Sequence, residues 1–294
     1  MASGKYDLAI VGGGLSGGLL ALALREKRPE LRVALIEAED HFGGNHIWSF
    51  FDSDIEPEHR WLVDPLISKS WDSYDVHFPK YSRSLQTGYN SITSKKFNAV
   101  IGQRLDKKHL ITGSKVKVMS KEHISFSSGK KIAATTVIDA RGGGDFSALE
   151  YGWQKFLGQM LHLKKPHGLD RPVIMDARVD QLDGYHFVYC LPFGNMDVFV
   201  EETYYSNGRD LDKTACRQRI AEYAARQGWE IADIAAEEFG QLPVVYGGDF
   251  DQFWQDNDGL GARIGARAAL AHPITSYSLP MAVRTAISIC EMPE

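Results

Sequence analysis

The sequence has few cysteines. Three occur among 294 residues, at Cys190, Cys216 and Cys290, and no two of them form a C-x-x-C pair. Cysteines so few and so far apart do not build a disulfide framework, and they are typical of a chain that folds in a reducing compartment. No group of histidine, cysteine and acidic residues has the spacing of a metal site. We therefore expect three buried free thiols and no metal centre.

Positive charge and long apolar runs are also scarce. The chain has 33 lysine and arginine residues against 38 acidic ones, a net charge of −5, and no stretch is visibly basic. This composition argues against binding to nucleic acid. We expect no signal peptide, and the uncharged stretch 8–24 is too short and too rich in glycine for a membrane span. What remains is an ordinary folded protein with one large domain or two intimate ones.

A glycine-rich turn near the N-terminus is the strongest motif. An apolar strand over residues 6–11 leads into three glycines that fit G-x-G-x-x-G: Gly12, Gly14 and Gly17. The first permits a tight turn, the second lets a pyrophosphate approach the backbone, and the third lets the following helix pack against the strand. A second apolar strand, 33–36, leads to Glu37, which is placed to accept ribose hydroxyls. The alternative is a glycine-rich turn with no ligand.

Three further segments have the character of cofactor loops. Residues 42–50 contain Gly44 and Asn45 among aromatic residues, which suits a loop against a flat cofactor, or an aromatic loop that closes the sheet. The apolar strand that begins at residue 136 ends at Asp139, followed by Gly142, and ligands of open α/β sheets bind at such carboxyl ends. His272 and Pro273 lie in a late segment that returns to this character.

Local patterns predict the remaining elements. We expect helices over 55–70, 97–105 (capped by Ser94), 214–227 and 280–289. We expect strands over 74–78, 84–89, 116–119, 123–126, 130–133, 173–179, 185–192 and 197–205. Asp183 and Gly184 indicate a tight hairpin between 173–179 and 185–192. The strands after residue 150 therefore predict an antiparallel sheet, a suitable floor for an apolar substrate.

Two adjacent acids, Glu201 and Glu202, are the candidate catalytic groups. In a regular strand neighbouring side chains point to opposite faces, so Glu201 shares a face with Phe199 and Thr203, and Glu202 shares the other with Val200. One carboxyl group can then face a cavity while the other faces solvent or a helix. A carboxyl in an apolar pocket has a raised pKa and becomes a proton donor near neutral pH. The alternative is a pair of acids at a solvated strand end.

Several segments together resemble the FAD-dependent bacterial lycopene β-cyclases, over nearly the whole chain. These segments are 6–8 with the glycine turn, 43–50, 166–169, 174–177, 184–189, 201–205 and 272–280. The resemblance implies an α/β fold, with a Rossmann-like FAD-binding βαβ domain and an interleaved antiparallel β-sheet substrate domain. We assign residues 1–70, 95–150 and 255–294 to the first part, and 71–94 and 151–254 to the second.

The resemblance also implies a reaction and its requirements. The acyclic ends of lycopene are protonated and closed to β-ionone rings without net redox change, and the family's essential carboxylate maps to Glu201. Reduced FAD is required, with NAD(P)H as its electron source. The partners are lycopene and related carotenoids, with peripheral contact to the inner face of the cytoplasmic membrane. The number of rings formed and the oligomeric state stay open.

Two departures from the family pattern stand out. Ala269 and Ser276 occupy positions where the family usually has glycine, and their side chains could crowd the flavin. The chain also stops earlier than the family does, so we expect weak activity, poor stability, or both. Two rival hypotheses are a redox flavoenzyme, such as a hydroxylase or reductase of an apolar lipid, and a non-catalytic flavin-binding remnant.

Overall fold

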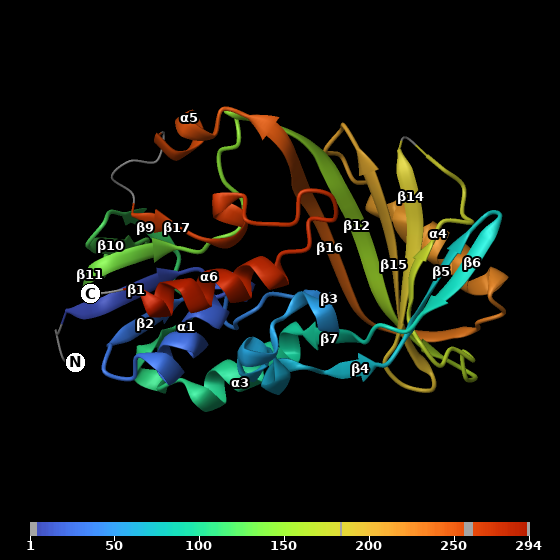
Figure 1. Ribbon diagram of the computed structural model, residues 1–294, viewed down its shortest axis with the longest axis horizontal. Helices are drawn as coiled ribbons and strands as arrows, with labels where there is room; N and C mark the ends of the chain where they lie inside the picture. Colours follow the sequence, from blue (N-terminus) through green and yellow to red (C-terminus); the bar gives the residue numbers. More distant parts are fainter. Residues whose placement is uncertain (1–4, 183, 256–260, 293–294) are drawn as a thin grey trace.

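The computed structural model describes residues 5–182, 184–255 and 261–292. Two large sheets lie side by side, and a small sheet and several helices fill the region between and below them (Figure 1). The α/β fold class predicted from the sequence is confirmed. Within the described ranges, no helix has both the length and the apolar character needed to cross a membrane.

The first sheet contains the glycine turn. Its strands are arranged in the order β8 (Leu110–Ile111), β2 (Val33–Ile36), β1 (Tyr6–Val11), β11 (Lys131–Asp139), β10 (His123–Phe126) and β9 (Val116–Met119), with β17 (Ala262–Arg263) beside β11. The pairs around β1, β2, β8, β11 and β17 are parallel, whereas β9 and β10 form an antiparallel extension. Strand β1 is buried on both faces, which explains its continuous apolar sequence.

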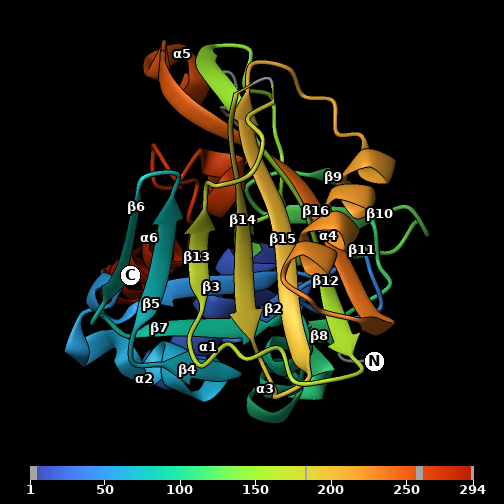
Figure 2. The same cartoon turned by 90° about the vertical axis from the view of Figure 1, so that its right-hand side faces the viewer.

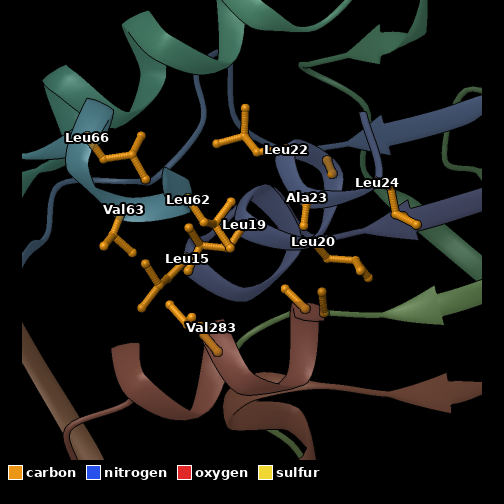
Figure 3. Close-up of a cluster of buried hydrophobic side chains, with 14 of the residues drawn as sticks. Leu15, Leu19, Leu20, Leu22, Ala23, Leu24, Leu62, Val63, Leu66 and Val283 are labelled. Atoms are coloured by element: carbon orange, nitrogen blue, oxygen red, sulfur yellow. The ribbon is translucent and has the colours of Figure 1, made fainter. Parts of the chain in front are cut away.

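Helices cover one face of this sheet. They are α1 (Leu15–Lys27), α3 (Ser94–Arg104) and α6 (Leu279–Glu291). The leucines of α1 lie between α6 and the short α2 (Arg60–Val63), where they contact side chains such as Val63 and Val283 (Figure 3). The opposite face of β1 packs against β9 and β10. Burial on both sides makes the glycine turn the end of a rigid strand–helix unit.

The second sheet is large and mostly antiparallel. Its strands are arranged in the order β16 (Ile231–Gly248), β12 (Leu149–Leu163), β15 (Asp197–Ser206), β14 (Tyr185–Pro192), β13 (Val173–Asp176), β5 (Tyr74–Phe78) and β6 (Tyr81–Leu85). Helix α4 (Lys213–Arg226) packs on one face (Figure 2). The other face is rich in aromatic side chains and is turned toward a three-stranded sheet of β3 (Ile47–Phe51), β7 (Tyr89–Thr93) and β4 (Lys69–Trp71). A short helix, α5 (Phe250–Gln255), follows β16.

The helix predicted over 55–70 is wrong in length. Two prolines divide it into the 3₁₀ turn Pro57–His59, helix α2 and the 3₁₀ turn Asp64–Leu66, and the chain then enters β4. Proline cannot donate the backbone hydrogen bond that a longer helix needs. The predicted cap of α3 is also wrong: Thr93, not Ser94, accepts the hydrogen bond from the backbone N–H of Lys96.

Several strand predictions need correction. The strand predicted over 84–89 is interrupted: residues 84–85 end β6, residues 86–88 connect the two strands, and residue 89 begins β7. The loop predicted over 42–50 becomes β3 from Ile47 onward. The stretches 130–133 and 136–139 belong to the single strand β11. Asp183 lies outside the described residues, but β13 ends well before Gly184, so a longer connection replaces the predicted tight hairpin. Strand β16 was not predicted, because its sequence is only weakly hydrophobic.

The three cysteines are buried and free, as predicted. Burial raises the pKa of the Cys190 thiol to about 12 and those of Cys216 and Cys290 to about 11. All three are therefore packing residues with low thiolate content.

Candidate active site

The glycine turn has the geometry of a ligand cradle. Gly12 has φ of +111°, and a Cβ there would lie 2.7 Å from the backbone of Ala140. A Cβ on Gly17 would lie 2.0 Å from the carbonyl oxygen of Gly12. Backbone atoms therefore leave no room for a side chain at either Gly12 or Gly17. A Cβ on Gly14 would meet nothing within 4 Å. The space that the middle glycine leaves open is therefore available to a ligand.

The end of α1 and the Glu37 carboxylate frame this open space. Gly14 is the N-cap of α1 and makes no side-chain capping hydrogen bond, which leaves the first N–H groups of the helix suited to a phosphate. Glu37 follows β2 directly, and its carboxylate accepts hydrogen bonds from the backbone N–H of Gly13 at 2.7 Å, Ala38 at 2.6 Å and Glu39 at 3.1 Å. These bonds hold an anionic acceptor beside the turn, and the residues fit a dinucleotide.

Asp139 lies at the carboxyl end of β11, as the sequence indicates, but it has protein partners. One carboxylate oxygen accepts from Arg141 Nε at 2.8 Å, and the other accepts from Arg141 Nη2 at 2.7 Å and Arg267 Nε at 2.9 Å. Burial by itself would raise the pKa of Asp139, but the two arginines outweigh it and hold the pKa below its usual range. Gly142 follows, with open space where a Cβ would be. A role for either in cofactor binding stays a prediction.

A short loop connects the glycine turn to the second sheet. The N–H of Gly43 donates to the carbonyl of Gly13 at 2.9 Å. Asn45 Nδ2 donates to the backbone carbonyl of Glu237 on β16 at 3.1 Å. The N–H of Ile47 donates to the carboxylate of Glu238 at 2.8 Å. Residues 43–47 therefore contact both the proposed cofactor turn and the face of the second sheet.

The other predicted residues of the cofactor set are exposed loop positions. Gly44 has φ of +59°, and its carbonyl accepts from His41 Nε2 at 3.2 Å. His272 and Pro273 are exposed, and His272 Nδ1 accepts from the backbone N–H of Ile274 and Thr275. The N–H of His272 donates to the carbonyl of Tyr277, so this turn lies next to the tyrosine cluster described below.

The two departures from glycine share a backbone conformation. Ala269 has φ of +55° and Ser276 has φ of +56°, and no other non-glycine residue in the described ranges has a positive φ. This left-handed conformation costs an L-residue about 1–2 kcal/mol. Glycine is thus suited to both positions because of the local backbone, a reason that does not require contact with the flavin.

The double-acid strand β15 is regular, so its two acids face opposite sides. It pairs with β12 and β14 without a register shift. Glu202 is fully buried under α4, where its carboxylate pairs with Arg219 Nε and lies 3.1 Å from His186 Nε2. Glu202 is therefore a buried ion-pair partner between the sheet and α4. The structure does not bring it together with Glu201.

Glu201 points to the aromatic face of the sheet. It shares this face with Phe199 and, across the strands, with Tyr189, both of which are buried. Its Oε1 accepts a hydrogen bond from Thr203 Oγ1 at 2.6 Å. Burial, and next the negative charge of Glu238, raise the pKa of Glu201 well above its ordinary value. A carboxyl group held in this way keeps its proton to higher pH than a solvated one and can act as an acid.

Glu238 is a buried acid that the sequence did not reveal. It lies on β16 opposite Gly158 of β12, and Gly158 lies opposite Glu201. The two carboxyl groups are within hydrogen-bonding reach of each other. Besides the Ile47 N–H, the imidazole Nδ1 of His46 lies 3.6 Å from Glu238 Oε2. The sequence could have revealed this pair only if β16 had been predicted as a strand.

Three tyrosines gather beside Glu201. Tyr89 on β7 contacts Tyr189 on β14 at 2.7 Å and Tyr277 at 3.0 Å between hydroxyl oxygens. Burial raises the pKa of all three phenols well above the usual value, and the charge of Glu201 acts in the same direction on Tyr189 and Tyr277. Three phenols and an acid with raised pKa values therefore line one region between the second sheet, β7 and the segment before α6.

Comparisons with known proteins identify the family of this chain. A family model described as "Lycopene cyclase protein" matches residues 7–292. A lycopene beta-cyclase from Pantoea ananas is 45% identical, with 96% of this chain and 73% of the relative covered. A lycopene beta-cyclase from Pseudescherichia vulneris is 43% identical, with 98% and 74% covered.

Solved structures share the fold at low sequence identity. A geranylgeranyl bacteriochlorophyll reductase-like protein from Thermoplasma acidophilum has a TM-score of 0.68 at 15% identity, with 98% of this chain and 77% of that chain covered. A flavin-dependent brominase has a TM-score of 0.67 at 15% identity, with 98% and 78% covered. The family match and the bacterial relatives confirm the resemblance seen in the sequence: this chain belongs to the lycopene cyclase family.

Proposed function

We propose that this protein is an FAD-dependent lycopene β-cyclase that closes the acyclic ends of lycopene to β-ionone rings. The observation that carries the proposal is Glu201, a carboxyl group with a raised pKa on an aromatic sheet face in a member of the lycopene cyclase family. The relatives that match over most of the chain are named for this activity.

The reaction needs an acid and a water-poor pocket. Glu201 donates its proton to the terminal double bond of lycopene, so its O–H bond breaks and a C–H bond forms. The next double bond attacks the resulting cation and closes the ring, and loss of a ring proton gives the β-ionone double bond. The product is an isomer of the substrate, so electrons and atoms balance without an oxidant.

The surroundings of Glu201 suit this chemistry. Phe199 and Tyr189 are buried beside it, and they exclude water that would compete for the proton or trap the cation. Aromatic π faces also attract cations, by about 0.5–2 kcal/mol each. The neutral phenols of Tyr89 and Tyr277 add polar partners without a competing negative charge.

The glycine turn supports FAD as the cofactor. Gly12, Gly14 and Gly17 would accommodate its pyrophosphate at the start of α1, and Glu37 would accept its ribose hydroxyls. We further propose Gly44, Asn45, Asp139, Gly142, His272 and Pro273 as the surrounding cofactor loops. When bound in reduced form, with NAD(P)H as electron source, the flavin supplies an electron-rich ring that favours a nearby cation.

The substrate determines where the protein works. A C40 hydrocarbon dissolves in lipid and hardly in water. We therefore propose that the protein is cytoplasmic and contacts the inner face of the membrane peripherally to take up lycopene and related carotenoids.

Pigment analysis tests the proposal directly. Cells that accumulate lycopene and express this chain should form γ-carotene or β-carotene. Purified protein given one dose of reductant under anaerobic conditions should complete many turnovers. Oxidation of one flavin per ring formed would instead support a redox flavoenzyme, and bound FAD without any turnover would support a non-catalytic remnant.

A further inference from the structure

A row of residues crosses the second sheet at Glu201. Tyr189, Glu201, Gly158 and Glu238 lie opposite one another on β14, β15, β12 and β16, and residues in such a row point to the same face. Neighbouring strands are about 4.8 Å apart, so one strand separates the two acids by about 10 Å at the backbone. Because Gly158 has no side chain, β12 itself places nothing between the two carboxyl groups, and the ring of Phe199 packs over this glycine.

Glu238 lies against a fixed backbone donor and a histidine. Its Oε2 accepts the Ile47 N–H at 2.8 Å, and His46 Nδ1 lies 3.6 Å from the same atom. Glu238 is only 3% exposed, so its carboxylate is held in place by protein groups. A hydrogen bond between two carboxyl groups requires that one of them carries the proton. Glu201 also accepts a hydrogen bond, but from the Thr203 hydroxyl, which can rotate, whereas the Ile47 N–H at Glu238 can only donate. Glu238 is therefore the fixed acceptor, which leaves Glu201 as the donor.

We propose that Glu238 is a positioning residue that keeps the catalytic proton on Glu201, so that the two side chains form a carboxylic acid pair with one shared proton. This inference rests on the proposed function and adds a residue to its site. Dissociation of Glu201 into water would place two carboxylates side by side, and repulsion between them opposes that dissociation.

The acid pair also accounts for the proton and the charges at each step of the reaction. Before transfer it carries one proton and one negative charge. Transfer to the alkene breaks the Glu201 O–H bond, forms a C–H bond and leaves two negative charges facing one carbocation, an arrangement that stabilises the cation. When the ring proton leaves, it returns to the pair, and the starting state is restored without an external acid.

Tyrosines and a histidine are the titratable groups that face the pair. They come from β14, β7, the segment before α6, β15 and the segment before β3: Tyr189, Tyr89, Tyr277, Tyr205 and His46. Of this set, only His46 can carry a positive charge, and its imidazole lies beside Glu238.

The test is the pH dependence of a variant that removes the charge of Glu238 but keeps its shape. Glu238→Gln can still accept the Ile47 N–H through its amide oxygen. Activity falls with rising pH as Glu201 loses its proton, and in this variant we expect the falling limb to move to lower pH by about one unit or more. Turnover well above the limb should then fall about tenfold. Infrared titration of the Glu201 carboxyl band should shift in the same direction.

Two further variants separate charge from structure. Glu238→Asp keeps the charge and should restore the limb toward its wild-type position. Glu237→Gln is the matched control, because Glu237 is the neighbouring acid of β16 and pairs with Arg217 and Gln159 instead. Its pH profile should be unchanged. All variants are compared at equal flavin occupancy.

Failure of this inference can be distinguished from failure of the proposed function. A uniform loss of activity in Glu238→Gln, with limb and infrared titration unmoved, would overturn the acid pair while leaving Glu201 as the acid. Full ring formation by Glu201→Gln would overturn the proposed catalytic acid itself. If Glu238→Gln does not fold, Glu238→Ala takes its place, and a limb and a carboxyl titration that both stay unshifted in Glu238→Ala would refute the pair.

Discussion

The adjacent acids Glu201 and Glu202 should give opposite phenotypes when each is changed to glutamine. Glu201→Gln keeps the shape of the side chain but removes the acidic proton, so we expect ring formation to fall by at least ~100-fold, the scale of general acid catalysis. Glu202→Gln leaves the acid in place, and turnover per folded molecule should stay close to that of wild type. The free energy of unfolding should show the opposite pattern, with a loss in Glu202→Gln and no loss in Glu201→Gln.

The size of the stability loss follows from the contacts of Glu202. Its fully buried carboxylate pairs with Arg219 and His186. Breaking a buried ion pair costs about 3–5 kcal/mol, and losing a hydrogen bond to a charged group costs about 1.5–3 kcal/mol. The Arg219 side chain is 29% exposed and can be partly rehydrated, so we expect a loss near the lower figure, about 2 kcal/mol. For a chain of this length this corresponds to a fall in Tm of about 3 °C.

Glu201→Gln should be at least as stable as wild type at neutral pH. The pKa of Glu201 is raised in the folded protein by burial and then by Glu238, above the ordinary 4.5. Between the ordinary and raised values the folded protein binds a proton that the unfolded chain does not bind. Wild-type stability therefore falls as pH rises through this window, and Glu201→Gln should lack that fall.

Thermal unfolding from pH 5 to pH 8 and anaerobic product analysis measure both properties on the same samples, with β-carotene and the one-ring intermediate quantified separately. Near-normal ring formation by Glu201→Gln, beside an inactive but stable Glu202→Gln, would refute the assignment of the two faces of β15.

Three more predictions follow from glycine positions and from backbone conformation. Gly14→Leu should fold with near-normal stability, because the position has open space, but should lose bound FAD; a full flavin spectrum after purification would contradict the cradle. Gly158→Ala would place a Cβ 2.2 Å from the Phe199 ring and should lower the free energy of unfolding by about 1–3 kcal/mol, with recovery in a Phe199→Leu background as the check. Ala269→Gly and Ser276→Gly should each raise stability by about 0.5–1 kcal/mol in denaturant titrations, since relief of left-handed strain exceeds the added freedom of the unfolded chain.

Features governed by local sequence could be predicted, and features that depend on tertiary contacts could not. The glycine turn and β1 were predictable because a doubly buried strand reads as a continuous apolar run. The opposite faces of Glu201 and Glu202 followed from the two-residue repeat of a strand. Strand β16 lacks such a pattern, because neighbours rather than its own residues determine its pairing, and Glu238 was missed with it. One protein partner of Asp139, Arg267, lies 128 residues away, beyond the reach of local patterns.

The loop of residues 43–47 has a thermodynamic consequence. One end is bonded to the glycine turn at Gly13, and the other end donates to the Glu238 carboxylate. A cofactor that moves Gly43 would therefore alter the electrostatic potential at Glu238 and Glu201. Because thermodynamic linkage is reciprocal, protonation of Glu201 would in turn alter the affinity for that cofactor. We expect the affinity for FAD to depend on pH across the titration of Glu201, and loading of the apoprotein to be accompanied by uptake or release of a fraction of a proton.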